Sequence, residues 1–205
     1  MRKSRFRSLL AAAGGALLAF LLISPAASAA SAAPAVSAVS AVPAETASPA
    51  TVGDLGGMLL REFCQANGFA DVTRRADVWF CIGNHKIDTA VPLTAACRWQ
   101  FSDLVRAGFT VTNNGGRCWA NPSAYADVGG IAVNQYCNSL GYSDASVGDN
   151  VASWRCVGHG TSVPIDFHAA CRWQNPAWVA KGFSLVSYFN NYGDRFGIRC
   201  LALSR

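Results

Sequence analysis

The hydrophobic positions of this chain follow the same order twice, first in residues 54–119 and again in residues 127–201. In both halves an aspartate precedes apolar residues that recur at the spacing of one helix face. The two sets are Asp54, Leu55, Leu59 and Phe63, and Asp127, Val128, Ala132 and Tyr136. Because an aspartate side chain caps the free N–H groups of a first helical turn, the pattern predicts helices that begin at these aspartates. A glycine four residues after a cysteine, Gly68 or Gly141, marks the expected end of each helix.

An apolar segment of strand type follows each of these helices, at 78–82 and at 152–157. In both segments a tryptophan stands two residues before a cysteine, so the two side chains share one face of the predicted strand. The polar links that follow, at 83–92 and 158–168, differ between the halves and are candidate binding loops.

The second expected helix of each half opens with the same six residues, Ala-Ala-Cys-Arg-Trp-Gln, at 95–100 and at 169–174. An identical run that includes Cys and Trp, two scarce residue types, indicates a duplicated unit. An asparagine and a proline at 175–176 predict a helix break in the second half.

Helical spacing assigns the side chains of the second helices to faces. Phe101, Leu104 and Val105 fall on the side of Cys97, and Trp178 and Val179 lie on the matching side of the other copy. The tryptophan of each hexapeptide points about 200 degrees away from its cysteine at 100 degrees per residue. We therefore expect these helices to be buried on two sides.

Each half is expected to close with a hairpin. In the first half a turn at 113–116 joins arms at 109–112 and 117–119, whereas a longer link joins 183–188 to 196–201 in the second. The tip of that longer hairpin is either a candidate contact site or a plain surface loop. Its candidate residues are Asn190, Asn191, Tyr192 and Asp194.

These patterns predict an α+β fold of two tandem, disulfide-stapled repeats related by pseudo-two-fold symmetry. Each repeat has the order helix, strand, helix, hairpin. Their expected bounds are 52–122 and 123–205, and the two are expected to pack as one globular unit.

The chain has eight cysteines, four in each predicted repeat. They are Cys64, Cys81, Cys97 and Cys118, then Cys137, Cys156, Cys171 and Cys200. No two are spaced as in a zinc ribbon or a thioredoxin-like site, so structural disulfides are the preferred interpretation. Three pairings are possible in each repeat; we favour neighbours in order, Cys64–Cys81, Cys97–Cys118, Cys137–Cys156 and Cys171–Cys200.

Residues 1–29 have the layout of a secretory signal peptide. Basic residues precede an apolar run from Leu9 to Ile23, and an Ala-x-Ala cleavage site follows at 27–29. The run is at the short end for a bilayer span, so an exported, extracellular protein is favoured over a membrane-anchored one.

Residues 30–51 form a leader rich in Ala, Val and Pro, with no glycine. Its prolines disfavour a helix and favour an extended chain. Val36, Val39 and Val42 recur every third residue, and Pro43 follows. The leader is therefore either a passive spacer or a segment whose apolar row lies in the groove of another protein.

Charge gives no indication of a nucleic-acid partner. Four of the 17 Lys and Arg lie in the signal peptide and all 12 Asp and Glu lie beyond it, so the mature chain has a net charge of +1. There is no clustered basic patch and no nucleic-acid motif.

Candidate catalytic chemistry is sparse. The three histidines, His85, His159 and His168, form no metal-binding motif with neighbouring acids, and the expected disulfides leave no free thiol. His159, Ser162 and Asp166 form a possible but unconvincing catalytic trio. We therefore expect no enzymatic activity, no metal and no cofactor.

The arginines of the hexapeptide, Arg98 and Arg172, have two interpretations. Each either hydrogen-bonds carbonyl groups or stacks on tryptophan within its own repeat, or pairs with an acidic partner. The structural role is preferred, because duplicated copies should agree in their shared core and differ where they bind. Binding is thus expected in the leader, in the loops and at the tip at 189–196.

The overall layout resembles the small secreted adaptor subunit of bacterial umbrella toxin particles. The features are the signal peptide, the extended leader and a repeated four-cysteine domain with AACRWQ at 95–100 and 169–174. The resemblance implies that the leader enters a cleft of a lectin-like subunit with a trypsin-like fold. It also implies that the compact domain docks on a helical-repeat spoke of the large toxin polypeptide, without catalytic residues.

Two other classes remain open. A secreted carbohydrate-binding module would use some of the six tryptophans as exposed stacking platforms. A secreted enzyme or inhibitor would need a polar cleft or a rigid reactive loop.

Overall fold

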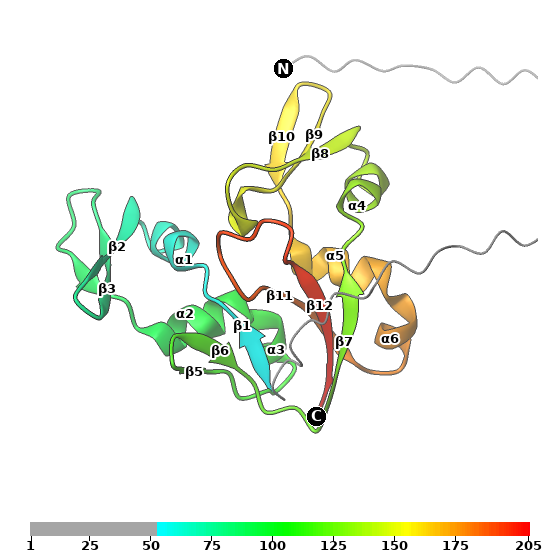
Figure 1. Cartoon of the computed structure of the whole chain (residues 1–205), viewed down its shortest axis with the longest axis horizontal. Helices are drawn as coiled ribbons and strands as arrows, with labels where there is room; N and C mark the ends of the chain where they lie inside the picture. The colour runs from blue at the N-terminus through cyan, green and yellow to red at the C-terminus, as the bar shows by residue number, and fades with distance from the viewer. Residues whose placement is uncertain (1–52) are drawn as a thin grey trace, which may run out of the picture. The chain divides into compact units, whose positions relative to one another are not determined.

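A computed structural model describes residues 53–205 (Figure 1). The expected signal peptide at 1–29 and leader at 30–51 lie outside the described residues, as do Val36, Val39, Val42 and Pro43. Within 53–205, none of the helices has the length and apolar character that a membrane span requires.

The first half contains six short strands in two antiparallel sheets, together with three helices. They are β1 (Asp54–Gly56), α1 (Leu60–Ala66), β2 (Asp71–Arg75), β3 (Val78–Ile82), β4 (Thr89–Ala90), α2 (Leu93–Gln100), α3 (Ser102–Arg106), β5 (Thr112–Asn114) and β6 (Arg117–Trp119). The strand order is β2-β3-β4 in one sheet and β1-β6-β5 in the other. The first strand therefore pairs with the last strand of the same half.

The second half adds two further antiparallel sheets. Its elements are β7 (Ala124–Gly130), α4 (Val133–Ser139), β8 (Asp144–Ser146), the short 3-10 helix η1 (Val151–Ser153), β9 (Arg155–Gly158), β10 (Thr161–Pro164), α5 (Phe167–Gln174), α6 (Pro176–Ala180), β11 (Ser184–Tyr188) and β12 (Arg199–Ser204). The strand orders are β8-β9-β10 and β7-β12-β11. The protein thus has a mixed α and β fold with small antiparallel sheets.

The predicted starts of the first helices are wrong, because Asp54 and Asp127 lie in strands β1 and β7. The Asp54 carboxylate accepts the Gly56 N–H at 2.8 Å and pairs with Arg117 of β6 at 2.8 Å. Gly56 has a φ of +87°, which a helix does not permit. A short aspartate turn therefore replaces the expected N-cap, and a strand precedes helix α1 in the observed order.

The predicted ends of the first helices agree with the structure. Gly68 has a φ of +79°, and its N–H bonds the Gln65 carbonyl at 2.9 Å. The next residue, Phe69, donates to the Cys64 carbonyl at 3.0 Å, which completes a Schellman motif. The same pattern of bonds ends α4 at Gly141.

The hexapeptides form the last six residues of α2 and α5, with a break after each helix. Phe101 and Leu104 are fully buried as expected, but Val105 is exposed. The cause is the break at Phe101, which starts the new helix α3 and changes the phase of the later side chains. Trp99 and Trp173 are 39% and 41% exposed, so the expected burial of these helices on two sides is also wrong.

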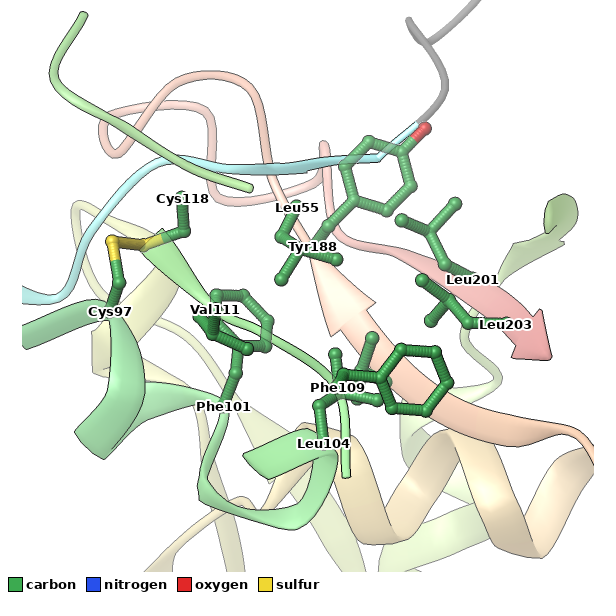
Figure 2. Close-up of a cluster of buried hydrophobic side chains, with 11 residues drawn as sticks. Leu55, Cys97, Phe101, Leu104, Phe109, Val111, Cys118, Tyr188, Leu201 and Leu203 are labelled. Carbon is green, nitrogen blue, oxygen red and sulfur yellow. A yellow bond between two sulfur atoms is a disulfide. The ribbon is translucent and has the colours of Figure 1, made fainter. Parts of the chain in front are cut away.

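Eleven buried side chains form the largest core cluster, which joins the two halves of the chain (Figure 2). Leu55, Phe101 and Leu104 come from the first half, and Leu201 and Leu203 of β12 face them. The cluster therefore makes the packing of each half depend on the other.

Four disulfides connect the eight cysteines, in the pairs that the sequence favours. They are Cys64–Cys81, Cys97–Cys118, Cys137–Cys156 and Cys171–Cys200. In each half, one bond joins the first helix to the middle strand of the following sheet, β3 or β9. The other bond joins the hexapeptide helix to the last strand, β6 or β12.

Candidate functional site

A cavity of about 390 Å³ lies where α1 and the end of α2 meet the segment from η1 to α5. Four aromatic residues contribute to its walls: Trp99, Trp154, Phe167 and Phe189. Glu62, Gln100 and His168 bring polar groups to the same space. Because both halves supply its walls, the cavity exists only in the packed domain.

The loop between β11 and β12 closes one side of this cavity and bonds to both halves. The Phe189 carbonyl accepts the Gly57 N–H at 2.8 Å, and the Tyr192 carbonyl accepts the Val151 N–H at 3.0 Å. Figure 1 shows the loop between α1 and the sheet of β8, β9 and β10. The loop that only the second half carries is therefore part of the domain's packing.

The candidate residues at the tip of this loop divide into two groups. The Asn190 side chain accepts from Arg117 at 2.9 Å, and the Tyr192 hydroxyl donates to Glu62 at 3.1 Å, so both connect to the first half. Asn191 and Asp194 are exposed and accept only local backbone N–H groups, from Gly193 and Phe196. Asn191 and Asp194 remain open to an external contact.

His168 lines the cavity and is held in place by hydrogen bonds. Its Nε2–H donates to the Gln100 carbonyl at 2.9 Å, and its Nδ1 accepts the Ser187 N–H at 2.9 Å. These bonds require the neutral ring and fix its tautomer. Burial lowers the pKa of His168 below its usual value near 6.5, which further favours the neutral ring.

The lowered pKa of His168 gives a pH-dependent stability. Below about pH 6.5 the His168 side chain binds a proton in the unfolded chain, whereas burial in the folded chain disfavours the protonated ring. The free energy of unfolding should therefore be unaffected by His168 above pH 7. It should fall by up to about 1.4 kcal/mol per pH unit as the pH drops from 6.5 toward the lowered pKa.

Urea denaturation between pH 7.5 and 5 measures this slope. The variant His168→Asn keeps an acceptor near the Ser187 N–H but does not titrate, so its curve should be flatter over the same range. His159→Asn at an exposed turn is the matched control and should leave the slope of the parent unchanged. A parent curve as flat as that of His168→Asn would contradict the prediction.

Two carboxylates line the cavity, Glu62 and Asp166, and Glu62 is the one with a buried oxygen that lacks a hydrogen-bond partner among the described residues. Its Oε1 accepts from the Tyr192 hydroxyl at 3.1 Å, while Oε2 is buried and has no hydrogen-bond partner within residues 53–205. Burial, together with the neighbouring Glu62 carboxylate, raises the pKa of Tyr192 to about 12, so the phenol stays a donor.

The hexapeptide arginines contact the protein itself. Arg98 donates to the Val111 carbonyl at 3.2 Å, in its own half. Arg172 pairs with Asp103 of the other half at 2.7 Å. The preferred structural interpretation therefore fits both residues, although Arg172 connects the halves instead of bonding within its own.

The possible catalytic trio is not assembled. His159 lies in the turn before β10, Ser162 lies in that strand, and Asp166 caps α5 by accepting the Ala169 N–H at 2.9 Å. No hydrogen bond between these three side chains occurs in the described part of the chain. Residues 53–205 also contain no group of three or more His, Cys, Asp or Glu placed to hold a metal ion.

Sequence reasoning did not identify Glu62 or the cavity. One signal was present: the cysteine alignment places Glu62 opposite Gln135, so the halves differ in charge at one helix position. Tyr192, which contacts Glu62, comes from the loop that the first half lacks. Both features lie where the two halves differ in sequence.

Comparison with known proteins gives no relative for this chain: no family model matches it, and neither a curated protein nor a solved structure is detectably similar.

Proposed function

We propose that this chain is a secreted, non-enzymatic adaptor that connects protein subunits of an extracellular complex of the umbrella toxin type. The observation that carries the proposal is a domain stapled by four disulfides that follows a sequence with the layout of a signal peptide and a glycine-free segment rich in Ala, Val and Pro. Disulfides persist in the oxidising environment outside the cell, where such a domain would work.

The adaptor domain is proposed to consist of two tandem copies with pseudo-two-fold symmetry, at 52–122 and 123–205. Three features support this duplication: the shared hexapeptide, the matching positions of the disulfides, and a last strand at the centre of a three-stranded sheet in each half. Two copies give two different surfaces, as an adaptor requires.

The leader and the compact domain are assigned to different partners. The leader, through Val36, Val39, Val42 and Pro43, would enter a groove of a lectin-like subunit. The compact domain would dock on a helical-repeat toxin polypeptide, and the exposed side chains of Asn191 and Asp194 belong to the surface available for this contact.

Deletion of residues 30–51 tests the assignment of the leader. We expect the signal peptide fused directly to residue 52 to export a folded domain that no longer recovers the groove-bearing partner from culture supernatant. A second variant with serine at Val36, Val39 and Val42 should lose the same partner, because it removes the apolar row but keeps the length.

Replacement of Ser37 and Ser40 with alanine is the matched control, and it should retain the partner. Recovery of identical partners by the full mature chain and by the deletion variant would contradict the leader assignment.

A carbohydrate-binding module is the second candidate, and the exposure of Trp99 and Trp173 favours it. Each tryptophan is about two-fifths exposed, and its ring packs edge-on against another aromatic ring, that of Phe63 or Tyr136. Glycan binding that survives deletion of the leader and is lost in Trp99→Ala or Trp173→Ala would support this function in place of the adaptor.

A further inference from the structure

The cavity beside Glu62 contains a negative group without a counter-charge. The ion pairs among residues 53–205 all use aspartates, and Arg61, the next residue on α1, pairs with Asp71 at 2.9 Å. A buried carboxylate oxygen without a partner lowers stability. A cation bound in the cavity, which Glu62 lines, would supply the counter-charge that this carboxylate lacks.

The principal side-chain donors around the cavity are already used within the protein. His168 Nε2–H bonds the Gln100 carbonyl, and Gln100 Nε2 donates to the Gly57 carbonyl at 3.1 Å. Trp154 Nε1–H donates to the Arg195 carbonyl at 2.7 Å. These side-chain donors are therefore bonded to backbone carbonyls and not to the Glu62 carboxylate. This favours a ligand that supplies hydrogen-bond donors of its own.

The aromatic walls suit a positive group as well. Faces of tryptophan and phenylalanine attract ammonium and guanidinium ions, most strongly where water is excluded. Trp99, Trp154, Phe167 and Phe189 surround the space, whose volume of about 390 Å³ is ample for one long side chain. A carboxylate together with aromatic rings forms an environment that favours a bound cation.

We propose that this cavity binds a basic side chain, arginine or lysine, that a partner polypeptide inserts next to Glu62. Trp154 of the cavity wall also borders an apolar surface: Phe196 is 68% exposed and packs edge-on against Trp154, with ring centres 6.0 Å apart. Residues on either side of the basic side chain would cover this apolar surface. The site goes beyond the role of the leader and does not depend on it, because it lies within 53–205.

Capped tripeptides test the proposal on the full mature chain. The probes are acetyl-Ala-Arg-Ala-amide, its lysine analogue, and a citrulline analogue that keeps the shape of arginine without its charge. Tryptophan fluorescence and NMR shifts of the Trp99 and Trp154 indole groups report binding. We expect saturable binding of at least one basic peptide, with the citrulline peptide about tenfold weaker because it lacks a charge-assisted bond.

Glu62→Gln is the decisive variant, because glutamine keeps an oxygen for the Tyr192 hydroxyl and removes only the charge. It should bind the basic peptide about tenfold more weakly and should itself unfold at an equal or higher temperature than the parent. Asp77→Asn is the matched control, since it makes the same change of net charge at an exposed turn and should leave binding unchanged.

Three results would overturn the proposal. They are equal binding of the arginine and citrulline peptides, undiminished binding by folded Glu62→Gln, and no saturation by either basic peptide at its solubility limit. Competition of a methyl glycoside for the same tryptophan signals, with no response to the peptides, would assign the cavity to a sugar. None of these results depends on whether the leader finds its partner.

Discussion

Replacing Phe101 with alanine is expected to lower the free energy of unfolding by about 4 kcal/mol. The Phe101 side chain is fully buried at the junction of α2 and α3, and its ring lies 5.4 Å from the His168 ring between centroids. The variant loses the hydrophobic transfer energy of the ring and leaves a cavity that close packing prevents from collapsing. Chemical denaturation followed by circular dichroism measures the change.

Phe196→Ala is the matched control, because it removes the same atoms from a side chain that is 68% exposed. It should change the free energy of unfolding by less than about 0.5 kcal/mol. Since the core cluster contains residues of both halves, Phe101→Ala should also keep a single transition at a lower denaturant concentration. Two separate transitions would mean that the halves fold independently, contrary to the packing in Figure 2.

Local sequence patterns predicted the ends of the first helices and several buried positions, because these depend on neighbouring residues. The favoured disulfide pairs came from joining cysteines in order, one of three pairings possible in each half. The glycines at 68 and 141 act within the last turn of a helix, whereas the paired cysteines are 17 to 29 residues apart. The starts at Asp54 and Asp127 were mistaken for a physical reason. An aspartate bonds the N–H two residues ahead equally well in an N-cap and in a turn, so the residue type does not distinguish them.

The cavity had no local pattern from which to predict it. Glu62, Trp154 and Phe189 come from three distant segments, and only the packing of the two halves brings them together. The break at Phe101 has a similar origin, since no proline marks it as Pro176 marks the equivalent break. Tertiary packing determines both features.

Removing two disulfides of similar span should have different consequences because of where they lie. Cys64–Cys81 and Cys97–Cys118 are 17 and 21 residues apart, so the chain-entropy model gives each about 3 kcal/mol. Cys97–Cys118 belongs to the core cluster shared by both halves, whereas Cys64–Cys81 packs in the outer cluster of α1 and β3. Replacing both Cys97 and Cys118 with alanine should therefore lower the stability of the whole domain by about 3 kcal/mol.

The variant with alanine at Cys64 and Cys81 should instead open locally. Hydrogen exchange should show lost protection in β2 and β3, while the amides of β11 and β12 remain protected to nearly the parent level. Uniform loss of protection in both double variants would contradict this division. Because α1 carries Glu62 and is fastened by Cys64, the same variant should also lose binding of the basic peptides while its core stays folded.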